Sequence, residues 1–217
     1  MKPTIIFDLD GTLVDTERYY RIFWPKALAH FGYELSDEQA LMLRSLGRPY
    51  APAQFKEWFG QDVDYWTIRN YRKEIMEEQL AKDGLSLKKG ALELLTWLKE
   101  HEIPTAIATA TDLERAGAYL EKLGIREYFD DVISAHQVEF GKPAPDTYLL
   151  ACRQLGKAPE KCFAVEDSPN GVLSAYRAGC KVIMIPDQTE PDEKLQNLLY
   201  ARLDTLTDII SLFAGKF

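Results

Sequence analysis

The feature that most constrains this chain is a short apolar run, residues 4–7, followed at once by Asp8-Leu9-Asp10-Gly11. The run is brief, rich in branched and aromatic residues, and ends at a turn signal, which predicts a buried strand. Side chains alternate along a strand, so Asp8 and Asp10 are expected on the same side, where their charges repel. A divalent cation would offset this repulsion, and carboxylate oxygens suit magnesium. An Asp-Gly turn with a spare acid is the alternative interpretation.

Residues 16–83 carry helical patterns and no convincing strand. Apolar residues at helical spacing predict helices over residues 17–31, 51–59 and 64–80. Pro25 lies inside the first of these, which predicts a kink or a restart. A capping box at residues 36–39 predicts a further helix that runs to Leu46 and ends at Gly47. This stretch is therefore expected to form an all-helical block.

From residue 86 onward, helical and strand patterns alternate. Strands are expected at residues 105–108, 131–134, 162–165 and 181–185, with helices at 90–100, 112–124, 145–155, 169–178 and in the remainder. Strands separated by helices predict a parallel sheet that is covered on both faces. The predicted fold class is α/β: a Rossmann-like parallel sheet core formed by residues 1–15 and 84–217, and an inserted α-helical domain formed by residues 16–83.

Composition narrows the choice of partners and compartment. The net charge of −8 disfavours nucleic acid or an anionic membrane as a main partner, so binding of an anion would require a local positive site. The three cysteines lack CxxC spacing, which argues against a disulfide framework or a zinc site. No signal peptide or membrane-spanning run is recognised. We expect a cytoplasmic protein, monomeric by default.

Polar residues follow four of the predicted strands at the edge where an open parallel sheet binds its ligands. Alone, each has an ordinary explanation, such as a strand-end hydroxyl, a solvated loop lysine or a helix cap. Together they supply carboxylates, hydroxyls and an ammonium, which are the groups needed to hold a metal ion and a phosphate. They are Asp8 and Asp10, Thr109 to Thr111, Lys142 between Gly141 and Pro143, and Glu166-Asp167-Ser168.

In order and spacing, these motifs resemble those of the haloacid dehalogenase-like hydrolase superfamily, in the branch with a helical cap inserted after the first strand. The resemblance covers essentially the whole chain. Its most specific part is Asp8-Leu9-Asp10-Gly11-Thr12-Leu13-Val14-Asp15-Thr16. The other parts are Thr109, Lys142 in Gly-Lys-Pro-Ala-Pro-Asp, and Glu166-Asp167-Ser168 followed by Asn170-Gly171.

The resemblance implies a role for each motif residue. Asp8 is the implied nucleophile that forms an aspartyl-phosphate, and Asp10 the implied acid and base. Thr109 and neighbouring backbone N–H groups would hold the phosphoryl oxygens, and Lys142 would neutralise them. The implied metal ligands for Mg²⁺ are Asp8, Asp10 through its backbone carbonyl, Asp167, and Glu166 either directly or through water.

The resemblance also implies that the helical domain closes over the core and carries substrate-binding residues. These are expected near Thr16, Tyr20, Arg48, Pro49 and either Arg69 or Arg72, facing Ala110 and Thr111 of the core. Arg48 in Gly47-Arg48-Pro49 is the preferred candidate, because a guanidinium could bind a second anionic group. A solvated loop arginine is the competing interpretation.

The predicted function is a magnesium-dependent phosphatase that acts on a small phosphate monoester, with sugar and polyol phosphates as candidates. Asp10 favours this chemistry, because superfamily members that cleave carbon–halogen bonds or phosphonates usually lack an acid there. The alternatives are a β-phosphoglucomutase-like phosphosugar mutase and an inorganic pyrophosphatase. Tyr20 stands where those mutases carry a histidine and therefore disfavours the first. A receiver-like phospho-acceptor would be far shorter and would lack the inserted domain.

Overall fold

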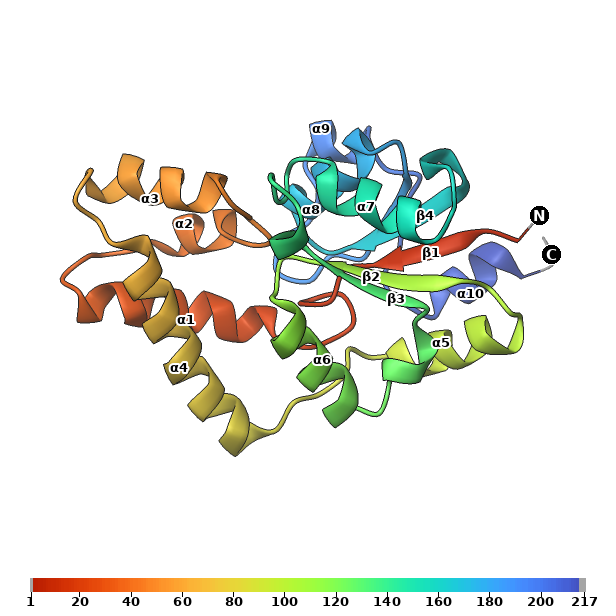
Figure 1. The fold of residues 1–217 in the computed structure, drawn as a ribbon, viewed down its shortest axis with the longest axis horizontal. Helices are drawn as coiled ribbons and strands as arrows, with labels where there is room; N and C mark the ends of the chain where they lie inside the picture. Colours follow the sequence, from red (N-terminus) through yellow and green to blue (C-terminus); the bar gives the residue numbers. More distant parts are fainter. Residues whose placement is uncertain (1, 215–217) are drawn as a thin grey trace.

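The computed structural model describes residues 2–214, which form a single six-stranded parallel sheet with helices around it (Figure 1). The strand order is β3-β2-β1-β4-β5-β6, so the direction of winding reverses at the central β1. An open α/β sheet binds its ligands at such a switch point. This topology confirms the predicted Rossmann-like α/β class. The strands are β1 (Thr4–Phe7), β2 (Thr105–Thr109), β3 (Asp131–Ser134), β4 (Cys162–Glu166), β5 (Lys181–Met184) and β6 (Ala201–Arg202).

Both faces of the sheet are covered by helices, as the alternating pattern predicted. Along β1, Ile5 and Phe7 enter one apolar cluster and Ile6 enters the other, because successive side chains point to opposite faces. The first cluster is covered by α5 (Ala91–Glu100), α6 (Leu113–Lys122) and α10 (Asp208–Phe213). The second is covered by α7 (Asp146–Gln154), α8 (Pro169–Arg177) and α9 (Glu193–Gln196).

Four further helices lie together beyond one end of the sheet, and we refer to them as the helical block (Figure 1). The block has its own apolar cluster, in which Phe55 is fully buried and its ring contacts those of Trp24 and Tyr65. A separate core lets these helices form without the sheet's apolar surface. The helices are α1 (Glu17–His30), α2 (Asp37–Met42), α3 (Tyr50–Phe59) and α4 (Tyr65–Asp83).

The structure excludes one of two alternatives at Pro25 and corrects two other details of the sequence prediction. The first helix runs through Pro25 as one element, held by the buried neighbours Trp24 and Ala27, so it does not restart. The capping box at Ser36 is present, yet α2 ends at Met42 rather than Leu46. The C-terminal remainder is not all helical, because it contains β6 paired in parallel with β5. A strand of two residues is too short to produce a periodic pattern.

The early end of α2 has a tertiary cause. The Asn170 side chain on α8 donates hydrogen bonds to the carbonyls of Met42 (3.1 Å) and Arg44 (2.8 Å), replacing helical partners. Further along, the Gly47 N–H donates to the Lys142 carbonyl at 2.8 Å. A Cβ on Gly47 would lie 2.8 Å from the Cα of Gly141, so the two backbones can approach this closely only with glycine at that position. Gly47 thus joins the block to the sheet domain instead of ending a helix.

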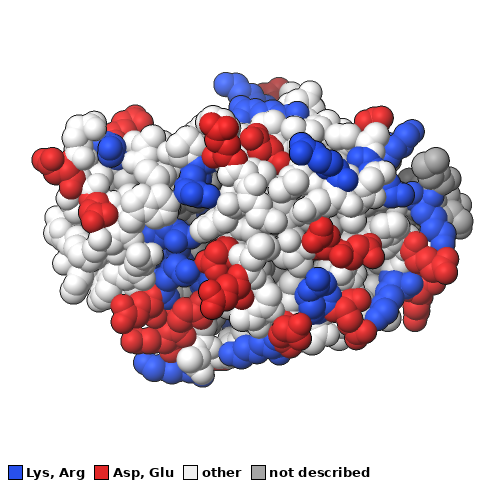
Figure 2. Space-filling model, viewed as in Figure 1, with Lys and Arg blue, Asp and Glu red and all other residues white. Residues whose placement is uncertain are grey.

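Surface charge is mixed on the face shown in Figure 2, where acidic and basic side chains are interspersed over both the helical block and the sheet domain. Among residues 2–214, none of the helices is long and apolar enough to span a membrane.

Candidate active site

Two carboxylates from neighbouring strand ends meet around one ammonium group. Lys142, in the loop before α7, donates to Oδ1 of Asp8 at 2.5 Å and to Oε1 of Glu166 at 2.6 Å. The Tyr148 hydroxyl donates to the same Glu166 oxygen at 2.7 Å. Parallel pairing of Phe7 with Val165 places Asp8 and Glu166 side by side at the carboxyl ends of β1 and β4. All four side chains are buried, so these contacts are shielded from water.

An acidic group with unused oxygens lies at the same place. Asp8, Glu166 and Asp167 each offer a carboxylate oxygen within 4.8 Å of the others. Oδ2 of Asp8 and Oε2 of Glu166 are buried and have no hydrogen-bond partner in the part of the chain that the structure describes. Buried acceptors of this kind normally have partners, and hard oxygen ligands suit Mg²⁺. The donor set therefore fits the predicted metal ion.

Gly171 makes room for this group. A Cβ at that position would lie 2.0 Å from the carboxylate carbon of Glu166. Any residue larger than glycine at position 171 would therefore displace the Glu166 side chain. The Ser168 hydroxyl caps α8 by accepting from the Gly171 N–H at 3.2 Å, which fixes the start of the helix behind Glu166 and Asp167.

The electrostatics reflect more buried acid than base. Burial raises the pKa of Asp8 well above its ordinary value, and Glu166 and Asp167 raise it further against the opposing effect of Lys142. Burial likewise raises the pKa of Asp167 to about 7, although Arg44 opposes the shift. For Lys142, burial alone would lower the pKa, but the two carboxylates that it contacts outweigh burial and raise it. The group therefore favours a bound cation.

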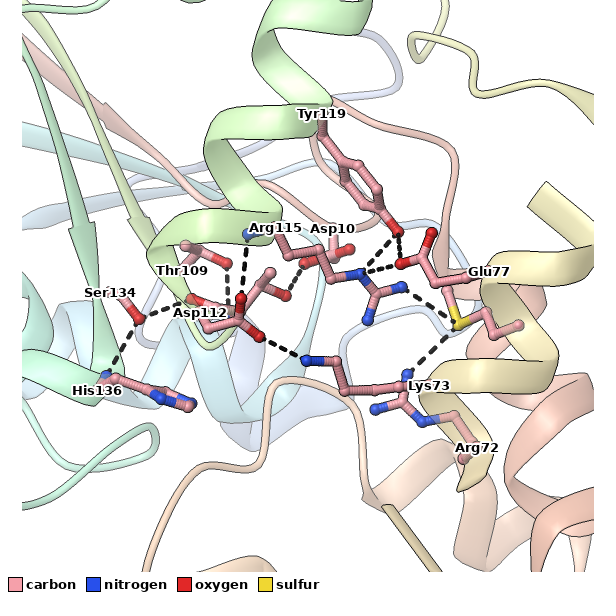
Figure 3. A network of polar contacts seen from close by, with 12 residues as sticks. Asp10, Arg72, Lys73, Glu77, Thr109, Asp112, Arg115, Tyr119, Ser134 and His136 are labelled. Atoms are coloured by element: carbon pink, nitrogen blue, oxygen red, sulfur yellow. Dashed lines mark hydrogen bonds and ion pairs between the residues drawn. The ribbon is translucent and has the colours of Figure 1, made fainter. Parts of the chain in front are cut away.

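Asp10 lies outside this acidic group and is held by two hydroxyls. Thr16 donates to Oδ1 and Thr111 donates to Oδ2, each at 2.7 Å. The Thr111 N–H in turn donates to the Thr109 hydroxyl at 3.0 Å, and its carbonyl accepts from Ser134 at 2.7 Å (Figure 3). Asp10 is thus oriented by Thr111 in the loop that follows β2 and by Thr16 at the start of α1.

A cavity of about 80 Å³ separates these strand ends from the helical block. From the sheet domain it is lined by Asp8, Asp10, Ala110 and Thr111, all singled out from the sequence, together with Asp112 and Arg115. From the block it is lined by Tyr20, whose hydroxyl is 3.5 Å from that of Thr111, and by Arg44, Arg69 and Arg72 among others.

Three expected positions, Thr16, Arg48 and Pro49, lie outside the cavity lining. Thr16 is buried against Asp10 and is absent from the cavity lining. Arg48 is exposed and also outside the lining, so a substrate contact by Arg48 stays a prediction. Arg44 is a buried arginine of the cavity lining that the sequence analysis did not single out. Its Nη1 is 3.5 Å from Oδ2 of Asp167, and its Nη2 donates to Thr189 at 2.5 Å. Nothing in the sequence distinguished Arg44 from a solvated arginine.

The sequence analysis also did not single out Glu17, because no pattern marks it as buried. An acid in the first turn of a helix is commonplace, because it complements the helix dipole. In the structure Glu17 is buried in the cavity wall, with Oε2 lacking a hydrogen-bond partner. Burial, followed by the charge of Asp167, raises its pKa well above the ordinary value, against the influence of Arg44. Glu17 thus offers the cavity a carboxyl group with a free oxygen.

Comparison with known proteins finds matches along most of the chain. A family model described as haloacid dehalogenase-like hydrolase matches residues 2–179. Fructose-1-phosphate phosphatase YqaB of Escherichia coli is 32% identical over 180 residues, covering 82% of this chain and 94% of that protein. Hexitol phosphatase A of E. coli is 33% identical over 182 residues, covering 83% and 81% respectively.

Among solved structures, CbbY from Rhodobacter sphaeroides in complex with phosphate superposes with a TM-score of 0.79. It is 28% identical, and the match covers 96% of each chain. The similarity therefore includes the helical block as well as the sheet.

Proposed function

This chain belongs to the haloacid dehalogenase-like hydrolases, and from that premise we propose that it is a magnesium-dependent phosphatase of small sugar or polyol phosphates. The observation that carries the proposal is the buried contact of Lys142 with both Asp8 and Glu166, beside carboxylate oxygens that lack partners. Relatives named for fructose 1-phosphate and hexitol phosphates support the substrate class.

We assign Asp8 as the nucleophile. One of its oxygens forms a bond to phosphorus while the bond from phosphorus to the ester oxygen breaks, which leaves an aspartyl-phosphate. Water then attacks phosphorus and releases Asp8 and inorganic phosphate. A carboxylate attacks an anionic phosphate poorly, so nearby positive charge is required. Lys142, already in contact with Asp8, supplies part of that charge.

Asp8, Asp167 and Glu166 would hold the Mg²⁺ ion. When bound, the ion supplies positive charge that reduces repulsion between the carboxylate and the phosphate. Loss of a proton from Asp8 and Asp167, whose pKa values are both raised in the metal-free protein, accompanies binding.

Asp10 is assigned the proton transfers. It gives a proton to the leaving ester oxygen and later takes one from the attacking water, so its protonation state is restored after each turnover. The hydroxyls of Thr16 and Thr111 fix both carboxylate oxygens and can rotate as the proton arrives and leaves. Thr109 and the backbone N–H groups at the start of α6 would bind the phosphoryl oxygens.

The helical block acts in this proposal as a cap, with residues 16–83 as the moving domain and residues 1–15 and 84–217 as the core. The free volume of about 80 Å³ is smaller than the 300–1,000 Å³ typical of small-molecule sites. Substrate entry therefore requires the block to open, with hinges near residues 15–17 and 83–89. Closure then excludes water from the reacting groups.

Tyr20 counts against the mutase alternative. Burial raises the pKa of Tyr20, so its hydroxyl stays protonated near neutral pH and cannot exchange protons as a histidine does. Its hydroxyl lies 3.5 Å from Thr111, where it can bind a substrate oxygen.

Phosphorus NMR with Mg²⁺ and a panel of hexose phosphates, polyol phosphates, nucleotides and pyrophosphate tests the proposal. Release of inorganic phosphate from sugar or polyol esters is the expected result, and the Asp8→Asn protein should release none. A shifted ester signal without free phosphate, stimulated by a sugar bisphosphate, would instead identify a mutase. Preferential cleavage of pyrophosphate would identify a pyrophosphatase.

A further inference from the structure

Two buried arginines, one on α4 and one on α6, approach the same sulfur atom (Figure 3). Nη1 of Arg72, on α4, lies 3.3 Å from Sδ of Met76, and Nη2 of Arg115, on α6, lies 3.7 Å from it. Arg115 also forms an ion pair with Glu77 at 2.7 Å and donates to the Tyr119 hydroxyl at 2.8 Å. Arg115 is therefore a buried cation whose charge is balanced within the protein.

Arg72 has no such partner. Within residues 2–214 its guanidinium forms no hydrogen bond to oxygen and no ion pair, and its Nε is buried without any partner. Its Cζ lies 4.6 Å from the ring centroid of Tyr20 and 4.8 Å from that of Trp24. Aromatic faces attract a cation, but they accept few hydrogen bonds. A buried cation normally has a hydrogen-bonded counter-ion, and Arg72 lacks one.

None of the acids that line the cavity pairs with Arg72 among the described residues, and Glu17, which keeps a free oxygen, is influenced by Asp167 and Arg44 instead. Asp10 accepts from Thr16 and Thr111, and Asp112 is paired with Lys73 at 2.9 Å. Burial lowers the pKa of Arg72, Tyr20 opposes that shift, and the neighbouring charges of Arg115 and Arg69 lower the pKa further. Arg72 therefore lies among other cations, and no acid within residues 2–214 forms an ion pair with it.

We propose that Arg72 binds a second anionic group of the substrate, a phosphate or a carboxylate, at the part of the cavity lined by Tyr20 and Trp24. The group at this position is distinct from the phosphoryl group that reacts at Asp8. Tyr20 lies between the two positions, because its ring faces Arg72 and its hydroxyl approaches Thr111, the residue that donates to Asp10. This inference rests on the proposed function and narrows its substrates to phosphate esters with a second anionic end.

Binding measurements test this assignment without turnover. Calorimetry in the presence of Mg²⁺ measures the affinities of fructose 1-phosphate, fructose 1,6-bisphosphate and 6-phosphogluconate for two proteins. One carries Asp8→Asn alone, and the other carries Asp8→Asn together with Arg72→Met. We expect a doubly anionic probe to bind at least about 10-fold more tightly than fructose 1-phosphate, and Arg72→Met to remove about 10- to 100-fold of its affinity. Affinity for fructose 1-phosphate should change less than about threefold.

Two further variants sharpen the test. Lys82→Met removes an exposed charge from the same helix and should leave all three affinities unchanged. Arg72→Lys keeps the charge and should restore part of the lost affinity. If Arg72→Met lowers the affinity for the bisphosphate alone, the group bound by Arg72 is a phosphate. If it lowers the affinity for 6-phosphogluconate alone, the group is a carboxylate.

The assignment is wrong if Arg72→Met weakens all three probes equally or leaves the doubly anionic probes unchanged. A purely structural role would instead lower the melting temperature of Arg72→Met, whereas removal of an unpaired buried charge should preserve or raise it. Phosphate release by the wild-type protein is measured separately. Arg72-dependent binding without hydrolysis of any ester would refute the phosphatase and leave the anion site standing.

Discussion

The ends of the strands and the helical block differ in whether a buried cation is paired with an acid. At the strand ends, Lys142 is shared by Asp8 and Glu166, and each contact is 2.6 Å or shorter. In the block, Arg72 lies between two aromatic rings and has no counter-ion among the described residues. The reactive groups are therefore assembled before a substrate arrives, whereas the block's cation is completed only by a ligand. In the proposed function, the strand ends therefore carry the catalytic groups, and the helical block carries a group that binds the substrate.

The difference follows from the two kinds of secondary structure. Parallel pairing in the sheet fixes neighbours by register, so the residues after Phe7 and Val165 meet whatever the loops do. A helix fixes only which residues share a face, as Arg72 and Met76 do at a spacing of four. What lies opposite that face depends on packing between domains.

The largest expected effect is on catalysis by the strand-end acids. Asp8→Asn and Asp10→Asn should each lower kcat by about 10⁴-fold or more, because one removes the nucleophile and the other the proton donor. Circular dichroism should show an intact fold for both. Phosphate release at a wild-type rate by Asp10→Asn would refute its assignment, and with it the division of labour between the two regions.

Substitutions at Lys142 and Arg72 are expected to affect stability differently. Lys142→Met should destabilise the protein, whereas Arg72→Met should preserve or raise its stability. Lys142→Met leaves two buried carboxylates without their cation and should lower the free energy of unfolding by about 3 kcal/mol in metal-free protein. Urea denaturation measures this change. Lys99→Met, which removes an exposed ion pair with Glu127, should cost less than about 1 kcal/mol. Equal losses of stability for Lys142→Met and Arg72→Met would contradict the claim that, of these two cations, only Lys142 is paired with buried acids.

Removal of the metal should expose the pH dependence of the strand-end acids. Asp167 binds its proton more tightly in the folded protein, with a pKa of about 7 against the usual 3.8. The native state therefore holds a proton that the unfolded state has lost, and stability falls as pH rises between about 4 and 7, by about 1.4 kcal/mol per pH unit for one proton.

Thermal unfolding in EDTA and in excess MgCl₂ measures this effect. Mg²⁺ competes with the protons, so the stabilisation it gives should grow with pH over the same range. A melting temperature in EDTA that rises steadily through this range would contradict the raised pKa of Asp167.

The smallest expected effect is at the contact between the two regions. Asn170→Ala removes both hydrogen bonds that hold the segment after α2 against α8 and should favour the open form by about 1 kcal/mol. We expect KM to rise several-fold with kcat within about threefold. Asn70→Ala, at an exposed position on α4, is the matched control. An unchanged KM would show that this tether does not govern closure.

Much of the site was predictable because its residues follow strands. The carboxyl ends of parallel strands converge, so Asp8, Thr109 and Glu166 could be brought together from sequence alone. Lys142 was placed there because its loop follows a predicted strand, and the family resemblance then implied its role. Glu17 and Arg44 were not predicted, since an acid in the first helical turn and a loop arginine have no pattern that marks them as buried. The division at residues 16–83 stays a proposal about motion.

The sequence by itself determined the class of fold, the order of the motifs and the residues at the ends of the strands. Alternation of apolar side chains and hydrogen-bonded register are local properties, and the sequence carries them directly. Tertiary structure alone decided that α2 ends at Met42, that Gly47 contacts Gly141, and that Arg72 has no counter-ion within residues 2–214. These features depend on how the helical block packs against the sheet domain, and such packing joins residues far apart in the chain.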